Sequence, residues 1–420
     1  MNRITNGQES MKPGTDPARR DFMTRLAGAG AAVAFGGLGA ARDGLAQEAK
    51  PAAAEPAGTV PNAAVMAEKY PAMKPHSDRP LTASVPAEEH NFAVTPNDRM
   101  FIRNNLLTPD LDAGTHRLTV KGLVDKELAF SVEELKKAFP IVTTQAMLEC
   151  AGSGRSAYVP RASGTPWLAT GGMGCPNWTG VRLRDVLRAA GVKSGAAHVA
   201  GQGGDFGVVA TAAPVIRSIP LAKAMEEHTL VAWGMNEGPL PKVHGYPLRL
   251  LVPGWVGSAS TKWLHTLTVL DAPFKGTYMD GSYRIPRNPV KPGDKLPPDA
   301  VSAEAWPVKS MITRPAPNAV IKAGKPVVVE GRAWVGEGVI DKVDVSFDEG
   351  VTWQRAQFYP GDRYAWRSFS YEFHPAAPGY ATVLARATDD RGNVQPIVPA
   401  WNPLGYFWNG IHRVGFMVEA

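Results

Sequence analysis

The nine residues MLECAGSGR, Met147 to Arg155, carry the densest chemical information in the chain. The apolar run before them predicts a strand from Ile141 to Leu148 that delivers Cys150 to a glycine-rich turn. Small residues after the cysteine let the backbone approach a bulky ligand closely. Arg155 favours the thiolate and attracts anions, and thiolate is a donor that soft transition metals prefer. A metal-binding cysteine is therefore one interpretation, and a buried, inert cysteine is the alternative.

The second cysteine, Cys175, leaves a further alternative open. A single Cys150–Cys175 disulfide is compatible with the spacing in a compartment that permits disulfides. Two cysteines this far apart exclude the C-x-x-C-H signature, so we expect no c-type haem in this chain. His374-Pro375 is followed by two alanines, which does not resemble the loop of a cytochrome b5 module. Redox chemistry here would pass its electrons to a separate protein.

Cationic side chains stand next to glycine turns on either side of this stretch. Arg103 lies in FIRNN, residues 101–105, and His244 and Arg249 lie in HGYPLR, residues 244–249. Lys262 follows soon after, in TKW at residues 261–263. This combination suits a ligand with phosphate and polar ring atoms. A lone arginine or histidine is more often a surface group or a satisfied core group.

The segments around these motifs alternate between helix-like and strand-like patterns. Ser131 and Glu134 form a capping box that opens a helix ending before Pro140. Thr179 is expected to cap a second helix, with Leu183, Val186, Leu187 and Ala190 on one face and Gly191 closing it. Residues 247–252 predict a short apolar strand. The order of elements indicates an α+β fold rather than a regular βαβ array.

The composition changes after a proline- and lysine-rich link at residues 287–298. Five runs rich in β-branched and aromatic residues follow, at 327–334, 339–347, 352–358, 366–373 and 381–388. Asp348-Glu349-Gly350 between two of them predicts a tight hairpin. Short strands at this spacing predict an immunoglobulin-like β-sandwich of about 100 residues.

The N-terminal region has the features of an export signal. Arg19-Arg20 precedes an apolar, glycine- and alanine-rich stretch from Leu26 to Ala41. This pattern predicts a Tat signal peptide over residues 1–46 and a periplasmic protein. The apolar stretch is shorter than the roughly 20 residues that span a bilayer, so we expect no membrane span in the mature chain.

An Ala/Pro-rich tether and N-terminal extension follow at residues 47–90, and we expect ordered structure to begin near Asn91. The whole chain has 420 residues, 44% hydrophobic and 20% charged, with a formal net charge of +6. That charge is too small to indicate nucleic-acid binding.

The combined motifs resemble those of the sulfite oxidase family, and most of all its bacterial periplasmic sulfite dehydrogenases. In the first part the matching stretches are FIRNN, LECAGSGR, WTGVRLRDVL, VAWGMNEGPLP, HGYPLRLLVPGWVG, TKWL and YRIP. In the second they are VVVEGRAW, DKVDVSF, LARATDDRGNVQP and WNPLGYFWNGIHRV. The resemblance implies a mixed α/β molybdopterin-binding catalytic domain at 91–298 and a dimerisation-type sandwich domain at 299–420.

The resemblance also implies roles for individual residues. Cys150 matches the cysteine that coordinates molybdenum. The positions expected to hold the molybdopterin are Asn104, Asn105, His244, Arg249, Ser260, Thr261 and Lys262. Arg103 and Arg155 match arginines that draw an oxyanion to the metal, and Trp167 and Tyr283 match aromatic residues of that pocket. Cys175 is expected to be a free thiol near the site.

Two positions depart from the family pattern. Asn105 stands where the family usually has a histidine, and Leu404 stands where a third pocket arginine is expected. The implied reaction is oxidation of sulfite to sulfate, with electrons passing to a separate cytochrome c-like acceptor. The alternatives are another sulfur or nitrogen oxyanion (sulfane sulfur, a sulfoxide or nitrate) and a non-catalytic periplasmic oxyanion-binding protein with a Cys150–Cys175 disulfide. A homodimer through the C-terminal domain is also implied.

Overall fold

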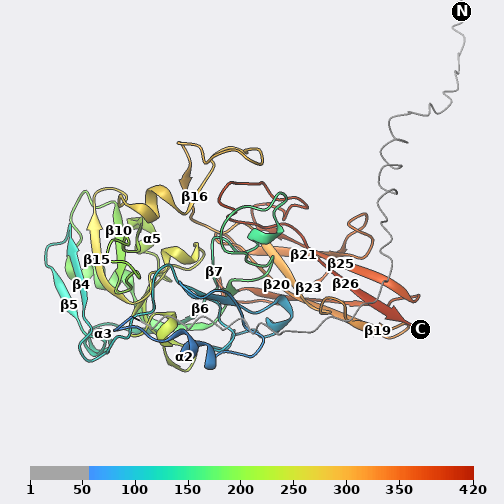
Figure 1. The fold of residues 1–420 in the computed structure, drawn as a ribbon, viewed down its shortest axis with the longest axis horizontal. Helices are drawn as coiled ribbons and strands as arrows, with labels where there is room; N and C mark the ends of the chain where they lie inside the picture. Colours follow the sequence, from blue (N-terminus) through green and yellow to red (C-terminus); the bar gives the residue numbers. More distant parts are fainter. Residues whose placement is uncertain (1–55) are drawn as a thin grey trace, which may run out of the picture. The chain divides into compact units, whose positions relative to one another are not determined.

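The computed structural model describes residues 56–420, which run from helix α2 (Asn62–Ala67) to strand β26 (His412–Glu419) (Figure 1). The predicted signal peptide and the first part of the predicted tether lie outside the described residues. The described residues all belong to one compact unit. Within residues 56–420, no helix combines the length and the apolar character needed to cross a membrane.

The segment before Asn91 is ordered, so the expectation that structure begins there is wrong. It contains α2, strand β1 (Lys74–Ser77), strand β2 (Thr82–Ser84) and the short helix η1 (Ala87–Glu89). Its apolar side chains include Val65, Met73 and Leu81, which pack with Val243 of the following domain. This burial explains why an Ala/Pro-rich composition does not prevent folding here. Strands β1 and β2 form a three-stranded sheet with β3 (Ile102–Arg103), which fixes Arg103.

The first domain is built on two five-stranded sheets. One sheet has the strand order β11-β10-β15-β4-β5. Its β15–β4 pair is parallel and its other pairs are antiparallel. Its strands are β4 (Leu118–Gly122), β5 (Leu128–Phe130), β10 (His198–Gly203), β11 (Ile216–Pro220) and β15 (Leu264–Leu270). The other has the order β13-β12-β9-β6, with β14 paired to β12; the strands are β6 (Ile141–Gln145), β9 (Asn177–Arg182), β12 (Leu230–Met235), β13 (Gly238–Pro239) and β14 (Arg249–Leu251). One apolar core joins them through residues such as Val120, Val231 and Leu267.

The helices α3 (Val132–Ala138), α4 (Leu183–Ala190) and α5 (Leu221–Ala224) accompany these sheets. The predicted capping box is confirmed, because Ser131 Oγ accepts from Glu134 N at 3.2 Å and Glu134 Oε2 accepts from Ser131 N at 2.7 Å. The predicted Thr179 cap is wrong. Thr179 lies inside β9, paired with β6, so that α4 begins only at Leu183. Its predicted apolar face is buried and Gly191 closes it with a φ of 70°.

The predicted strand at 141–148 is split in two. β6 ends at Gln145, and β7 (Leu148–Glu149) pairs instead with β8 (Met173–Gly174) in a separate small sheet. The strand predicted at 247–252 is the shorter β14. A link over 287–298 follows β16 (Arg284–Ile285), which pairs with β17 (Val301–Ser302).

The C-terminal domain consists of two mainly antiparallel sheets that share one apolar core, so it is a β-sandwich (Figure 1). The first sheet has the order β18-β20-β24-β23: β18 (Lys309–Arg314), β20 (Val327–Trp334), β23 (Gln357–Phe358) and β24 (Arg367–Phe373). The second has the order β19-β26-β25-β21-β22: β19 (Val320–Lys322), β21 (Ile340–Ser346), β22 (Gln354–Arg355), β25 (Gly379–Asp389) and β26.

All five predicted runs contain strands of this sandwich. The Asp348-Glu349-Gly350 turn joins the antiparallel strands β21 and β22, with positive φ at Glu349 and Gly350. Strands β18, β19 and β26 were not predicted. The immunoglobulin-like character of the sandwich stays a prediction.

Candidate active site

A cavity opens where β7, β14 and β15 meet the segment after β3. Its empty volume is about 720 Å³ including the part open to solvent, within the usual range for a cofactor-sized ligand. Apolar walls come from residues such as Phe101, Leu148 and Trp263. The polar residues that line it are Arg103, Asn105, Cys150, Asp205, His244, Arg249, Ser258, Ser260, Thr261, Lys262 and Tyr283.

Cys150 lies at one wall of the cavity, directly after β7. The turn is fixed by Cys150 N, which donates to Gly172 O at 2.8 Å, and by Ser153 N, which donates to Cys150 O at 2.8 Å. The short helix η4 (Gly257–Ala259) approaches this turn so closely that a Cβ on Gly257 would lie 2.7 Å from Glu149 O. A side chain there would push the two segments apart.

The two cysteines are free thiols in different environments, so the disulfide alternative is wrong. Cys150 is 7% exposed and lines the cavity. Cys175 is fully buried in a separate cluster with Met147, Met173 and Trp366, and burial raises its pKa to about 12. Cys175 is therefore free, as expected, but it does not line the cavity.

Another part of the wall, around Arg249 and Lys262, gathers buried cations without a matching number of anions. Arg249 Nη1 donates to His244 O at 2.9 Å, Nη2 donates to Ser260 O at 3.3 Å, and Nε has no partner. Burial lowers the pKa of Arg249 to about 9. Burial and the nearby Arg249 hold the pKa of Lys262 well below its usual value, despite an opposing effect of Asp205. Such a cluster is poised to take up an anion.

His244 belongs to the same cluster and has a partner that the sequence did not suggest. Lys69 Nζ lies 2.7 Å from His244 Nε2 and also donates to Asn97 O at 2.7 Å. Burial lowers the pKa of Lys69 to about 8. An ammonium group only donates hydrogen bonds, so with Lys69 charged His244 Nε2 accepts and its proton lies on Nδ1. Lys69 was missed because residues 47–90 were interpreted as a tether.

Asn104 supports this wall from behind. Its side chain is 1% exposed, accepts a hydrogen bond from Lys262 Nζ and donates to Thr108 Oγ1 at 2.8 Å. Lys262 Nζ also donates to Val243 O at 2.9 Å. The predicted residues Ser260 and Thr261 line the cavity beside Arg249, and Ser260 Oγ accepts from Val252 N at 2.9 Å. The predicted cofactor residues are thus brought together.

Arg103 connects the cationic wall to the cysteine. Burial is the largest single effect on the pKa of Arg103, and it lowers the pKa. The combined electrostatic effects of Tyr283, Cys150 and two further tyrosines, Tyr406 and Tyr278, are larger, so the pKa of Arg103 is raised overall. Tyr283 OH donates to Asn105 Oδ1 at 3.0 Å, and its ring stacks on that of Tyr406 with centroids 5.7 Å apart. Arg103, Tyr283 and Asn105 therefore form a polar group beside the thiol.

Arg155 and Trp167 do not line the cavity. Arg155 Nε donates to Leu404 O at 3.0 Å and Nη1 donates to Thr165 O at 3.2 Å. Its guanidinium fits a slot in which a Cβ on Gly152 would lie 2.6 Å from it. Trp167 has 0% exposure and packs edge-on against Phe101, which does line the cavity, at 6.1 Å between centroids.

Asp205 and Arg217 also belong to the site and were not predicted. Asp205 lines the cavity, and burial raises its pKa to about 6 although Lys262 opposes the shift. Arg217, on β11, lies 5.1 Å from the centroid of the Tyr283 ring and donates to Tyr278 O at 2.6 Å. Asp205 lies in a glycine-rich loop and Arg217 in a strand, so neither stands in a motif that singled it out.

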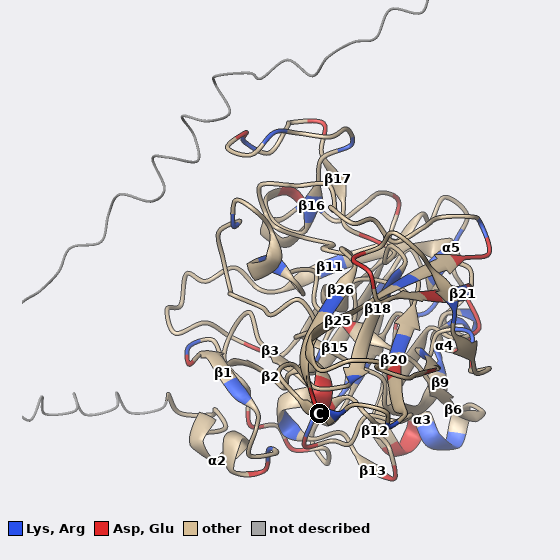
Figure 2. Cartoon of the chain, turned by 90° about the vertical axis from the view of Figure 1, so that its right-hand side faces the viewer, with Lys and Arg blue, Asp and Glu red and all other residues tan. Residues whose placement is uncertain are grey.

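The positive charge is a local feature of the cavity. In the view of Figure 2, basic and acidic residues are interspersed along the described part of the chain. Among residues 56–420 no cluster of three or more His, Cys, Asp or Glu side chains is arranged to hold a metal. Besides the Cys150 thiol, the lining residues of the cavity include several cations and one carboxylate, that of Asp205.

Comparison with known proteins agrees with this arrangement. The family model described as the oxidoreductase molybdopterin binding domain matches residues 105–278, and the Mo-co oxidoreductase dimerisation domain matches residues 301–419. Sulfite oxidase of Gallus gallus is 33% identical over 363 residues, which cover 82% of this chain and 78% of that protein. The chain belongs to the sulfite oxidase family. The predicted fold class, a mixed α/β domain of this family followed by a β-rich domain, is confirmed.

The chain is also similar to proteins that are named for different substrates. Mitochondrial sulfite oxidase of Rattus norvegicus is 36% identical over 368 residues, covering 83% of this chain and 66% of that protein. This chain thus spans about two thirds of the rat protein. NADH nitrate reductase of Volvox carteri is 30% identical over 375 residues, covering 80% and 42%. The structure of the sulfane dehydrogenase SoxCD from Paracoccus pantotrophus superimposes with a TM-score of 0.70 at 29% identity, covering 87% of this chain and 92% of that one.

Proposed function

We propose that this sulfite oxidase family member is a molybdopterin-dependent dehydrogenase that oxidises sulfite to sulfate. The observation that carries the proposal is that the Cys150 thiol, Arg103 and a cluster of buried cations line one cavity. A thiolate suits a soft metal, and the cations suit the phosphate of a cofactor.

The residues present fit a molybdopterin cofactor. Arg249 leaves Nε without a partner, and its charge and that of Lys262 are disfavoured until an anion arrives. His244, Arg249 and Lys262 would hold the phosphate, and Asp205 offers a carboxylate to N–H groups of the pterin. Cys150 would supply the thiolate ligand. When bound, the cofactor supplies two-electron oxygen-atom transfer, which no side chain of the protein provides.

The role of the protein is to bind and orient the substrate anion. Arg103 is held cationic by its surroundings, and it lies where it attracts an oxyanion toward the Cys150 side of the cavity. Tyr283 and Asn105, joined at 3.0 Å, offer further hydrogen-bonding groups. Apolar side chains such as Phe101 and Leu148 line the same cavity, and polar interactions are stronger beside apolar walls than in open water. Arg155 acts indirectly, because it fixes the turn and the Leu404 backbone rather than facing the cavity.

The choice of substrate depends on the number of cations in the pocket. Leu404, at the position of the expected third arginine, contributes only its carbonyl oxygen to Arg155 and packs against the apolar core. One cation fewer weakens the attraction for a dianion. Oxidation of sulfane sulfur is the second candidate, favoured by the likeness to the sulfane dehydrogenase SoxCD over 87% of this chain. The nitrate reductase relatives keep nitrate as a further test substrate.

We further propose that the protein is exported to the periplasm by the Tat route and transfers its electrons singly to a separate cytochrome c-like acceptor. The Arg19-Arg20 motif and the apolar stretch after it support the export. The match to a dimerisation domain at residues 301–419 supports a homodimer through the C-terminal domain.

The test is sulfite-dependent reduction of ferricyanide by protein whose molybdenum content has been measured. Turnover with sulfite supports the proposal and makes Leu404 a question of affinity. Full molybdenum without sulfite turnover overturns the proposed substrate, and the same protein is then assayed with thiosulfate, a sulfoxide and nitrate. Protein that holds no molybdenum after expression in a cofactor-producing host overturns the proposal as a whole.

A further inference from the structure

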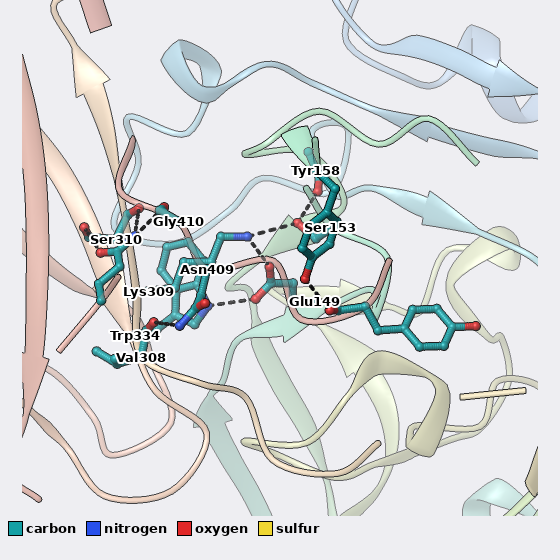
Figure 3. Close-up of polar contacts among 12 residues, drawn as sticks. Glu149, Ser153, Tyr158, Val308, Lys309, Ser310, Trp334, Asn409 and Gly410 are labelled. Carbon is teal, nitrogen blue, oxygen red and sulfur yellow. Dashed lines mark hydrogen bonds and ion pairs between the residues drawn. The ribbon is translucent and has the colours of Figure 1, made fainter. Parts of the chain in front are cut away.

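A buried carboxylate stands directly before the metal-binding cysteine and pairs with a lysine of the second domain (Figure 3). Lys309 Nζ, on β18, lies 2.8 Å from Glu149 Oε1, and the two side chains are 2% and 1% exposed. Trp334 Nε1, on β20, donates to Glu149 Oε2 at 2.8 Å. Both carboxylate oxygens are therefore held by strands of the sandwich.

Lys309 reaches both ends of the turn that contains Cys150. Besides Glu149 before the cysteine, its Nζ donates to Ser153 Oγ after it, at 3.4 Å (Figure 3). The Ser153 hydroxyl in turn donates to Gly171 O at 2.5 Å. The rings of Trp334 and Trp408 lie 5.7 and 5.3 Å from the ammonium. One lysine thus bridges the first and last residues of a turn of five.

Other parts of the second domain contact the same turn. Phe407 N donates to Ala151 O at 2.9 Å, and a Cβ on Gly154 would lie 2.7 Å from the Trp408 side chain. Neither Glu149 nor Lys309 lines the cavity, whereas Cys150 does. The sandwich therefore holds one side of the turn while the thiol faces the other side.

Stability alone is a weak reason for such a pair. Removing two charges from water costs about as much as their attraction returns, and apolar replacements of buried ion pairs are often no less stable. Groups that hold a metal ligand in one orientation, by contrast, have strong effects on metal binding and activity. The placement of this pair at the metal-binding turn favours the second role.

We propose that the Glu149–Lys309 pair positions the Cys150 thiolate, so that docking of the second domain sets the geometry of the metal-binding turn. The inference rests on the proposed role of Cys150 as the metal ligand. Lys309 acts through Glu149 and Ser153 and is a positioning residue. It touches neither the cofactor site nor the substrate.

The first test compares Lys309→Met with Lys223→Met in molybdenum-replete protein. Lys223 is a matched control, because it is also buried, pairs with Glu226 at 2.8 Å and does not contact the turn. We measure molybdenum per chain, the thiolate-to-metal charge-transfer absorption, kcat and KM. Lys309→Met should lower molybdenum content or kcat by about 10–100-fold and shift the absorption band, with KM little changed. Lys223→Met should lower only the thermal midpoint.

The second test keeps the hydrogen bonds and removes the charges. In the double variant Glu149→Gln/Lys309→Gln the two amides still bond to each other, and Trp334 keeps an acceptor. We expect the band and the molybdenum content to return to those of the wild type, whereas Lys309→Gln alone leaves both altered. This double variant also decides the matter if Lys309→Met does not fold.

Two outcomes overturn the inference: a folded Lys309→Met protein with wild-type band and kcat, or a folded double variant that recovers neither the band nor the metal. Failure of the proposed substrate is distinguishable, because it removes sulfite turnover from the wild type and leaves the band and molybdenum content to decide this inference. Wild-type protein without molybdenum would overturn both.

Discussion

Cys150 and Cys175 show how far the surroundings of one residue type decide its chemistry. Cys150 lines a cavity that is also lined by the guanidinium of Arg103. Cys175 is packed among methionines and tryptophans, and burial raises its pKa to about 12. A thiol of that kind stays protonated and unreactive. The two cysteines should therefore respond very differently to substitution.

Replacing Cys150 by Ser should abolish sulfite-dependent ferricyanide reduction, because an alcohol is a poor ligand for a soft metal. The circular dichroism spectrum should match that of the wild type, since the two side chains are nearly the same size. Cys175→Ala, at a thiol that does not line the cavity, is the control and should keep most of the activity. Wild-type turnover by Cys150→Ser would contradict the assignment.

Asp205 gives a prediction for pH. Burial raises its pKa from 3.8 to about 6, so the folded protein binds the proton more tightly than the unfolded chain does. This contribution to stability is present below pH 3.8 and is lost as the pH rises through about 6. In cofactor-free protein, Asp205→Asn should therefore gain stability relative to the wild type across that window. Urea unfolding midpoints at both ends of the window measure the difference.

The exposed Asp341, substituted by Asn in the same protein, is the control for this measurement. Its effect on the midpoint should be small and nearly constant with pH. A wild-type and Asp205→Asn pair whose midpoints run parallel from pH 3.8 to pH 6 would show that the buried carboxyl is not the cause.

At the scale of elements, the turn from β7 to the short helix η2 (Arg155–Ala157) holds the most demanding backbone of the site. Gly154 has a φ of +85°, and a Cβ there would lie 2.7 Å from the Trp408 side chain. The left-handed conformation alone costs a residue with a Cβ about 1–2 kcal/mol. The close approach of a ring from the second domain adds to that cost.

Gly154→Ala should therefore lower the free energy of unfolding by more than the cost of the backbone conformation. Gly195→Ala is a matched control, with a φ of +88° and no atom within 4 Å of the added Cβ, and should lose only about 1–2 kcal/mol. Gly154→Ala should also lower kcat, because it displaces the turn that carries Cys150 and Arg155. Equal losses of stability for the two variants, measured by urea unfolding, would rule out a clash with Trp408.

Features of the fold that depend on neighbouring residues could be predicted from the sequence, whereas features that depend on distant strands could not. The capping box at Ser131 and the apolar face of α4 depend on neighbours a few residues apart, and both were correct. Thr179 was misassigned because its preference for a helix cap is overridden by pairing with β6 and β12, which are distant in sequence. Strand β18 was missed because it is fixed by pairing with the distant strand β20, and its sequence KSMITR begins with a lysine, a residue that does not suggest a buried strand.

For the whole molecule, the site assembles from segments that are far apart in the chain. Resemblance to a known family placed Cys150, His244, Arg249 and Lys262 in one site, and the structure brings them together around one cavity. Lys69 and Asp205 were not predicted, because each lies outside the family motifs and reaches the site only through folding. Arg155 was assigned to the pocket from its motif, but its guanidinium is directed to backbone carbonyls of the two domains.

The C-terminal sandwich leaves apolar side chains on neighbouring strands of its five-stranded sheet. Val320, Tyr380 and Met417 are 60%, 61% and 43% exposed, and Met417 is in register with both of the others. Contiguous exposed apolar side chains typically mark a contact surface. Because residues 301–419 match a dimerisation domain, the homodimer proposed above would use a surface of this sandwich, and these side chains are a candidate for it.

The protein should sediment as a dimer at micromolar concentration, and Met417→Lys should weaken the dimer about tenfold or more, since burying an unpaired ammonium is costly. Val209→Lys is the matched control, because Val209 is 60% exposed but lies in the first domain. Analytical ultracentrifugation over a dilution series measures both dissociation constants. A monomeric wild type would contradict dimerisation itself. A dimer that Met417→Lys leaves intact would instead move the interface to another face of the sandwich. Activity assayed on the dissociated Met417→Lys protein tests one further point. If activity survives dissociation, each subunit carries a complete site, including its own Cys150 turn.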